Sequence, residues 1–291
     1  MPLRAMLIVN PGSRSGEASL EPALRRLEAG DVSIVRHWRA SPAGIPAFIR
    51  EHREAIDAVI VGGGDGTVSA VAGVLVGSDL PLGVLPMGTG NDFARTVGIP
   101  QDLAAAAGII AAGRTRRVDV GEVNGIGFLN VASVGISAAL ATEITTETKR
   151  RFGPLGYAIG TLRVLLRARP FRATIKSAAG EARVATLQIA IGNGRHYGGG
   201  LTIAPDARID DGQLDLYSLE TKRLWRLAIL APSFPSGEHR AAPDVRAGRG
   251  DWFEVTTTRP RPVNVDGEIR TMTPARFSVR PAALRIFASA F

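Results

Sequence analysis

Two stretches of this chain place a cluster of glycines between two apolar runs, and they constrain the fold more than any other feature. The first is VIVGGGDGTVSAV, residues 59–71, and the second is LGVLPMGTGNDFAR, residues 82–95. A short apolar run that ends in glycines is typical of a buried strand, and the apolar spacing after the glycines is typical of a helix. Strand, glycine turn and helix in this order favour a parallel sheet whose strands are connected by helices.

The first 120 or so residues repeat this alternation and predict an α/β domain. We expect strands at 3–9, 32–38, 58–61 and 82–85, and helices at 19–29, 45–53, 68–76 and from 91 onward. From about Val118 the pattern changes to short alternating runs separated by turn signals such as Asn124-Gly125 and Asp266-Gly267. These runs predict an antiparallel β-rich second domain, a sandwich or barrel. We expect one helix in it, at 157–168, and a loop at 231–250.

Composition narrows the class of protein. The chain has 291 residues, 45% of them hydrophobic, which suffices for one large domain or two modest ones. It has no cysteine, which excludes disulfides, thiolate metal sites and a cysteine nucleophile. No continuous apolar stretch is long enough for a membrane span, and the apolar run at 5–9 is too short for a signal sequence. We therefore expect a cytoplasmic protein.

The net charge of +8 favours anionic partners. A positive surface attracts phosphates, nucleic acid and anionic lipid headgroups. The basic residues form no long tract with interleaved aromatic residues, so we expect no nucleic-acid partner.

The GGGDGT turn predicts an anion site. Gly63, Gly64 and Gly66 allow a phosphate to approach the backbone closely, and the N-terminus of the following helix directs N–H groups toward it. Thr67 can cap the helix or donate to a phosphate oxygen. Asp65 would repel a phosphate unless Mg²⁺ or a proton intervenes, so it fits a metal–phosphate complex or proton acceptance from a hydroxyl; the alternative is a simple helix cap. The glycine spacing matches neither the P-loop nor the dinucleotide fingerprint.

Two further glycine-rich turns belong on the same edge of the sheet. Thr89, Asn91 and Asp92 follow the fourth strand, and NPGSRSG at 10–16 follows the first. Because loops at the carboxyl ends of parallel strands gather on one edge, we expect Asp65 and Asp92 to lie near each other across one crevice. Three such turns predict a cradle for nucleotide phosphates.

In this order, NPGSRSG, GGGDGT and GTGNDF resemble the diacylglycerol kinase catalytic domain family, which includes sphingosine and ceramide kinases and the bacterial YegS-like lipid kinases. The resemblance extends to IGNGRHYGGG at 191–200, APDARIDDGQLDL at 204–216 and VNVDGE at 263–268, and it covers essentially the whole chain. NAD kinases share a single GGDGT, whereas the full set in this order is strongly specific.

The resemblance implies a fold and a reaction. The fold is an N-terminal α/β domain like that of NAD kinases and phosphofructokinases, followed by an antiparallel β-sandwich domain, with the active site in the interdomain cleft. We place the nucleotide-binding domain at 1–122 and the lipid-substrate domain at 123–282, and expect the tail, about 283–291, to return to the first domain. The reaction transfers the γ-phosphate of ATP, with Mg²⁺, to a lipid hydroxyl of the diacylglycerol, phosphatidylglycerol or sphingoid type.

The family's functional positions carry over onto this chain residue by residue. Glu268 matches the proposed acceptor of the lipid hydroxyl proton, with Asp65 as the second candidate. Asp211 matches the carboxylate ligand of a structural Mg²⁺, completed by backbone carbonyls of Arg208 and Gln213. The positions assigned to ATP and its Mg²⁺ are Asn10, Arg39, Gly63, Gly64, Asp65, Gly66, Thr67, Val68, Ser69, Ala70, Gly88, Thr89, Asn91 and Asp92. Judged from the residues alone, Glu268 is an ordinary glutamate in a turn. Asp211 is likewise explained by the preference of Asp-Gly for hairpin turns, without a metal ion.

Two departures from the family pattern concern the nucleotide. Ser69 and Ala70 stand where the family has Asn-Glu, and Arg39 or Ser41 stands where it has a threonine that contacts ATP. His196, beside glycines in GRHYGGG, is not the family's base, and we read it as structural or substrate-facing.

The departures keep two alternatives open: a soluble kinase of the NAD kinase type, and a catalytically silent nucleotide-binding sensor. A lipid substrate would require contact with a membrane surface, peripherally on the inner face. Two basic clusters could bind anionic headgroups at this surface: residues 149–151, and Arg163, Arg167 and Arg169. The alternative is that they form a solvated basic face. A monomer and a homodimer are both compatible with the sequence.

Overall fold

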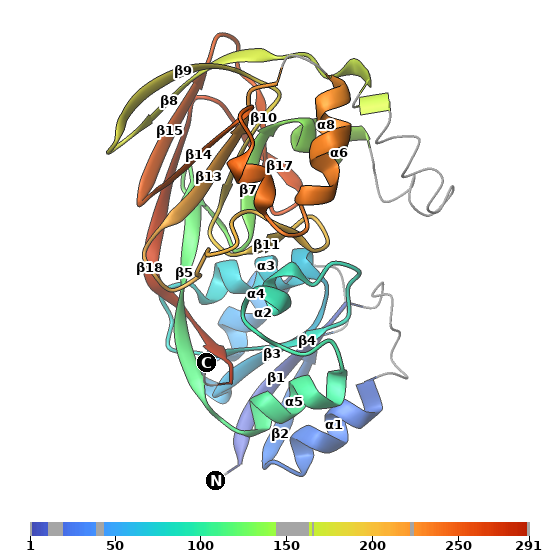
Figure 1. The fold of residues 1–291 in the computed structure, drawn as a ribbon. Helices are drawn as coiled ribbons and strands as arrows, with labels where there is room; N and C mark the ends of the chain where they lie inside the picture. Colours follow the sequence, from blue (N-terminus) through green and yellow to red (C-terminus); the bar gives the residue numbers. More distant parts are fainter. Residues whose placement is uncertain are drawn as a thin grey trace.

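The computed structural model describes residues 2–10, 20–38, 44–143, 163–164, 166–221 and 224–289. They form two domains, shown one above the other in Figure 1, with the N-terminal domain at the bottom. The expected α/β domain with a parallel sheet and the antiparallel β domain are both present.

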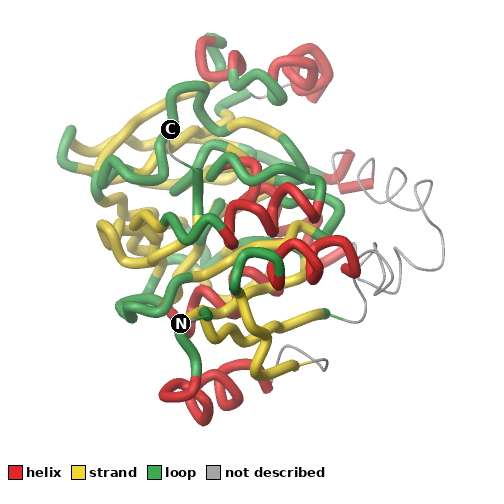
Figure 2. Tube along the Cα trace, turned by 90° about the horizontal axis from the view of Figure 1, so that it is seen from below, coloured by secondary structure: helices red, strands yellow, loops and turns green. Residues whose placement is uncertain are grey.

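The N-terminal domain is built on four parallel strands in the order β2-β1-β3-β4. Their apolar runs are continuous because both faces of such a sheet are covered by helices. Helices α1 and α5 pack together, as do α2 and α3, and Figure 2 shows helices on both sides of the strands. The elements are β1 (Leu3–Val9), α1 (Glu21–Glu28), β2 (Val32–Trp38), α2 (Ile45–His52), β3 (Ala58–Gly63), α3 (Asp65–Leu75), β4 (Leu82–Pro86), α4 (Asp92–Thr96) and α5 (Leu103–Ala111).

The C-terminal domain is a sandwich of two antiparallel sheets. One is β14-β13-β10-β7-β16-β17, and the other is the antiparallel part of a ten-stranded sheet; their facing side chains form one core. The strands are β5 (Thr115–Val123), β6 (Ile126–Phe128), β7 (Val131–Gly135), β8 (Phe171–Ser177), β9 (Gly180–Thr186), β10 (Gln188–Gly192), β13 (Leu214–Leu219), β14 (Val245–Gly250), β15 (Trp252–Thr257), β16 (Pro262–Val265), β17 (Glu268–Met272) and β18 (Ala275–Phe287). The short strands β11 (His196–Tyr197) and β12 (Leu201–Thr202) form a hairpin, and helices α6 (Ile136–Glu143) and α8 (Leu224–Leu230) complete the domain.

Strand β18 belongs to both domains. Its first half pairs antiparallel with β15, and its length pairs with β5 across an irregularity between Arg280 and Leu284. Its end pairs parallel with β4 at Ile286 and Leu82. One continuous sheet of ten strands therefore runs from the N-terminal α/β domain into the sandwich.

Some elements differ from the sequence predictions. Helix α3 begins at Asp65, three residues before the predicted start. The prediction was late because glycine usually indicates a loop, although the first turn of a helix tolerates it. The segment 231–250, predicted as a loop, contains two short 3₁₀ turns and β14, whose alternation is hidden by glycines and arginines. Helices α5 and α6 were not predicted, and the predicted helix at 157–168 lies largely outside the described residues. Among the described residues, no helix is long and apolar enough to cross a membrane.

Candidate functional site

Two glycine turns are in backbone contact at the carboxyl edge of the parallel sheet. A Cβ atom on Gly88 would lie 2.5 Å from the Cα atom of Gly64. Behind them, a Cβ atom on Gly63 would lie 2.8 Å from the Cβ atom of Thr67. Such distances exclude any side chain, so glycine here is what allows the turns after β3 and β4 to touch.

The N-terminus of α3 is partly exposed. Gly64 is the N-cap, and no side chain of the described residues caps the helix. The Thr67 hydroxyl instead accepts from Asn10 Nδ2 at 3.2 Å, which ties this helix to the end of β1. Gly66 is exposed, with no atom within 4 Å of a Cβ position. A helix N-terminus whose first N–H groups lack side-chain caps binds phosphate readily.

Asp65 and Asp92 lie side by side, each at the first position of a helix. A Cβ atom placed on Gly90 would be 3.2 Å from Asp65 Oδ2 and 3.5 Å from Asp92 Oδ2. Asp65 Oδ1 accepts from Phe93 N at 3.0 Å. Burial raises the pKa of Asp92, and the neighbouring Asp65 charge raises it further. The geometry thus brings the two predicted acids together.

Asp92 faces the second domain. Its two carboxylate oxygens accept from Gly199 N and Gly200 N, both at 2.8 Å, and these hydrogen bonds oppose the rise of its pKa. Gly199 and Gly200 have φ of 90° and 109°, a region that glycine adopts easily. The hydrogen bonds of Asp92 therefore hold the loop Gly198–Gly200 of the sandwich domain, the GGG loop, against the N-terminal domain.

Asn91 shapes its own turn. Its backbone is left-handed, with φ of 51°, and its side chain bonds to Gly88 N and Gly88 O at 2.8 and 3.1 Å and to Gln101 Oε1 at 2.7 Å. Thr89 is exposed at the tip of this turn. Asn91, in contrast, is buried.

The Asp266-Gly267-Glu268 turn, called the DGE turn below, docks onto α3. Asp266 accepts from the backbone N–H groups of Leu129, Asn130 and Val131 at 2.8 to 3.0 Å and from Ser69 Oγ at 2.7 Å. Burial raises the pKa of Asp266, and these four hydrogen bonds oppose the rise. Ser69, one of the departures from the family pattern, is thus a contact between the two domains.

Asn130 is a site residue that the sequence reasoning missed. Its Nδ2 lies 3.5 Å from Asp65 Oδ1, while its backbone N–H donates to Asp266. Its Oδ1 is buried and has no hydrogen-bond partner among the described residues. The only sequence signal is an asparagine after the apolar Phe128-Leu129 pair, which names no ligand.

A buried chain of hydrogen bonds supports the DGE turn from the sandwich core. Asn264 Oδ1 accepts from Gly267 N, and Asn264 Nδ2 donates to Ser137 O. Gln188 Oε1 accepts from Ser137 N and Oγ at 2.9 and 2.7 Å, and Gln188 Nε2 donates to the Tyr217 hydroxyl at 2.8 Å. The Tyr217 hydroxyl is 2.7 Å from that of Tyr197, and burial raises the pKa of Tyr217 to about 12.

Glu268 lies in the DGE turn at the start of β17. Its side chain is 68% exposed, and its Oε2 accepts from Arg270 Nη1 at 3.0 Å. The turn places Glu268 two residues from the Asp266 contact with α3, and its assignment as proton acceptor stays a prediction.

The predicted structural metal site lies in another turn. Asp211 is exposed, and its Oδ1 accepts from Gln213 N at 3.0 Å. Arg208 Nε forms an ion pair with Asp210 Oδ1 at 3.1 Å. Within the described ranges, no group of three or more His, Cys, Asp or Glu side chains could hold a metal ion. A cation at Asp211 would thus need backbone carbonyl ligands, and this site stays a prediction.

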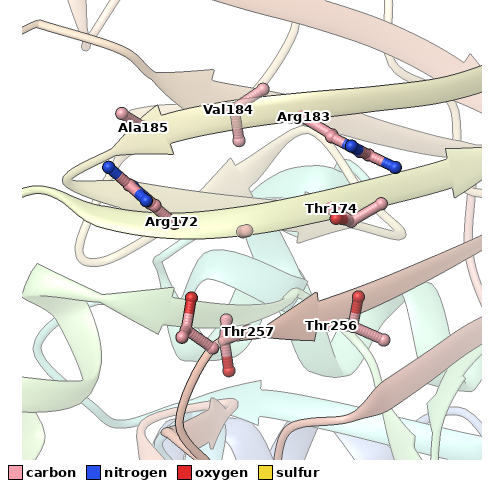
Figure 3. A pocket seen from close by; sticks show the side chains of 9 residues that line it. Arg172, Thr174, Arg183, Val184, Ala185, Thr256 and Thr257 are labelled. Atoms are coloured by element: carbon pink, nitrogen blue, oxygen red, sulfur yellow. The ribbon is translucent and has the colours of Figure 1, made fainter.

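A cavity of about 550 Å³ holds none of the predicted residues. It lies on the outer face of β8, β9 and β15, and Figure 3 shows Arg172 and Arg183 on neighbouring strands above Thr256 and Thr257. Arg39, the predicted loop at 11–16 and the basic cluster at 149–151 fall outside the described residues.

Comparisons with known proteins agree with this architecture. Residues 4–123 match the family model "Diacylglycerol kinase catalytic domain", and residues 130–288 match "YegS C-terminal NAD kinase beta sandwich-like domain". The "Probable lipid kinase YegS-like" of Klebsiella pneumoniae (strain 342) is 36% identical over 287 residues, covering 97% of this chain and 95% of the relative. The "Probable lipid kinase YegS" of Shigella boydii is 33% identical over 289 residues, with 97% and 95% covered.

A solved structure shares the whole fold. The crystal structure of "a putative diacylglycerol kinase" from Bacillus anthracis str. Sterne superposes with a TM-score of 0.83 at 26% identity, covering 98% of this chain and 95% of that one.

Proposed function

Since this chain belongs to the YegS-like lipid kinases of the diacylglycerol kinase catalytic domain family, we propose that it transfers the γ-phosphate of ATP to a lipid hydroxyl in the cleft between its two domains. One observation carries the proposal: Asp65 lies beside the open N-terminus of α3 and in contact with Asn130, a residue of the sandwich domain. Phosphoryl transfer needs positioning and charge stabilisation more than covalent chemistry.

The ATP phosphates would lie on the turn from Gly63 to Thr67. The support is the uncapped helix N-terminus, the exposed Gly66 and the position of Thr89 at the rim. The acceptor hydroxyl would enter from the sandwich side, where the DGE turn lies. Glu268, or Asp65 as second candidate, would take its proton.

The donor atoms around Asp65 fit Mg²⁺. The buried Asn130 Oδ1 has no hydrogen-bond partner in the described part of the chain, and it belongs to the side chain that contacts Asp65. Carboxylate and amide oxygens suit this cation. When bound with ATP, Mg²⁺ would offset the charge of the transferred phosphate. Asp65 and Asn130 would hold it, and the Phe93 N–H would keep the Asp65 carboxylate in place.

A transfer assay with γ-labelled ATP tests the proposal. The acceptors are diacylglycerol, phosphatidylglycerol, sphingosine and ceramide in mixed micelles, with NAD as the soluble control. Label in the organic phase supports a lipid kinase and names the acceptor class. Label on NAD alone would contradict the lipid assignment, and ATP binding without transfer to any acceptor would favour a silent sensor.

Two variants separate the proton acceptors. We expect Asp65→Asn to lower kcat by about 10²-fold or more without unfolding the protein. Glu268→Gln should lower kcat by a similar factor and remove the acidic limb of the pH–rate profile. Near wild-type turnover in Glu268→Gln would place the base elsewhere, with Asp65 as the next candidate.

A further inference from the structure

A second cavity lies on the seam between the domains and takes no part in the proposed transfer. Its volume is about 500 Å³. The nucleotide-binding domain contributes the last residues of α4, Arg95 and Thr96, and the sandwich domain contributes Arg195, His196 and the segment 206–210. The cavity lies at the end of α4, whereas Asp92 begins that helix, roughly 6 Å away along its axis.

The acids of this cavity are already paired. Asp206 Oδ2 is 3.1 Å from Arg249 Nη2. Asp210 lies between two guanidinium groups, with Arg208 Nε at 3.1 Å and Arg116 Nη1 at 3.4 Å. Neither carboxylate is therefore available to neutralise further positive charge in the cavity.

Two arginines of the cavity form no ion pair with any described residue. Arg95 Nε donates to Gly90 O at 3.0 Å, a neutral carbonyl. Among the described residues, no carboxylate lies within 4.0 Å of the guanidinium group of Arg95 or Arg195. Their charges still act nearby: the pKa of His196 is lowered first by burial and then by Arg195 and Arg95, and the charge of Arg95 also lowers the pKa of Asp92, which lies outside the cavity. One arginine without an ion pair to a described carboxylate thus comes from each domain.

His196 adds a neutral donor. Thr96 Oγ1 accepts from His196 N at 3.1 Å, and it lies 3.4 Å from His196 Nδ1. The Thr96 hydroxyl proton can then point to Nδ1, which leaves the ring proton on Nε2. Apart from the bond from Arg95 Nε to Gly90 O, the two guanidinium groups and the imidazole Nε2 donate to no acceptor among the described residues.

We propose that this cavity binds a phosphate group, as a phosphomonoester or phosphodiester, between Arg95 and Arg195, apart from the ATP phosphates on α3. Guanidinium groups bind phosphate oxygens by paired charge-assisted hydrogen bonds. A volume of about 500 Å³ exceeds that of phosphate alone and leaves room for a small organic group such as glycerol. The ligand is thus the headgroup of a phospholipid or a small soluble phosphate ester.

Such a ligand would join the two domains. Arg95 follows Asp92 on α4, and Arg195 precedes the GGG loop that bonds to Asp92. An anion bound between the two arginines would therefore stabilise the contact between α4 and the GGG loop. Ligand binding should therefore raise the melting temperature of the wild-type protein.

The test measures binding without ATP turnover, so its outcome is independent of the kinase assay. Glycerol 3-phosphate is titrated by calorimetry at constant ionic strength, with a non-hydrolysable ATP analogue present to occupy α3. In parallel, the protein is sedimented with vesicles of phosphatidylglycerol and phosphatidylcholine. The variants are Arg195→Ala and, as matched control, Arg172→Ala from the cavity of Figure 3.

We expect Arg195→Ala to weaken binding at least tenfold and Arg172→Ala to leave it unchanged. An effect confined to glycerol 3-phosphate identifies a soluble ester, and an effect confined to phosphatidylglycerol vesicles identifies a lipid headgroup. Equal binding by wild type and both variants, equal losses in the two variants, or no binding in either arm would overturn the proposal. Thermal melting of each variant without ligand shows that folding is retained.

Discussion

The glycine turn at 63–67 and the DGE turn at 266–268 both meet helix α3, but they are held in different ways. The glycine turn is held by backbone contact, because Gly64 and Gly88 touch with no side chain between them. The DGE turn is held by hydrogen bonds to side chains. Asn264 Oδ1 accepts from Gly267 N, and Ser69 Oγ of the other domain donates to Asp266. The glycine turn therefore leaves no room for a side chain, whereas the position of the DGE turn depends on a network of hydrogen bonds. Substitutions should therefore affect the two turns differently.

Gly88→Ala should have the largest effect on stability. The new Cβ would lie 2.5 Å from Gly64 Cα and 2.8 Å from Asn91 Oδ1, so the turns must separate. We expect a loss of about 2–3 kcal/mol in unfolding free energy, typical of overpacking, and a raised KM for ATP. Denaturant unfolding and initial-rate kinetics measure both.

The matched control is Gly73→Ala, in the exposed middle of α3 with no atom within 4 Å of its Cβ position. This change should stabilise the protein by about 0.5–1 kcal/mol. Equal effects of the two changes would show that the glycine turns can separate freely.

Gln188→Leu should weaken the DGE turn from a distance. Ser137 would lose its acceptor and the Tyr217 hydroxyl its donor, both in the core. We expect a loss of about 1–3 kcal/mol from unsatisfied polar groups, and a fall in kcat with the KM for ATP unchanged. Tyr197→Phe, which removes only the end of the chain, should do less. A raised KM for ATP with an unchanged kcat would show that this hydrogen-bond network does not act through the DGE turn.

Ser69→Ala should have a smaller effect on stability. It removes one hydrogen bond to Asp266, which keeps three backbone donors. We expect a loss of about 1.5 kcal/mol, at the low end for a bond to a charged group. Differential scanning calorimetry measures it. A loss as large as that of Gly88→Ala would mean that this single contact between the domains stabilises the fold as much as the packing of the two glycine turns does.

The smallest expected effect concerns how the free energy of unfolding changes with pH. The pKa of Asp92 is raised when folded, whereas its unfolded value is near 3.9. The folded state therefore binds the proton more tightly. This stabilisation is complete below pH ~4 and is lost as pH rises through the folded pKa. Urea unfolding from pH 3.5 to 7 should show wild-type stability falling relative to Asp92→Asn over that window, and parallel curves would contradict it.

The same contrast explains what the sequence predicted. Parallel strands and glycine turns depend on local backbone chemistry, so β1, β3, β4 and the meeting of Asp65 with Asp92 could be predicted. Asn130 and Gln188 act through partners 65 and 29 positions away. A single sequence does not encode such pairs in any readable spacing. The role of Ser69 was hidden for the same reason, since its partner is 197 positions away.

Strand β18 makes the N-terminal domain dependent on the end of the chain. The edge of β4 is covered by Ile286, and β5 is paired along most of its length with the same strand. A fragment ending at Val123 would leave both with open backbone groups, a template for pairing with other chains. The N-terminal domain, although its own residues are contiguous in sequence, is therefore complete only once β18 has been synthesised.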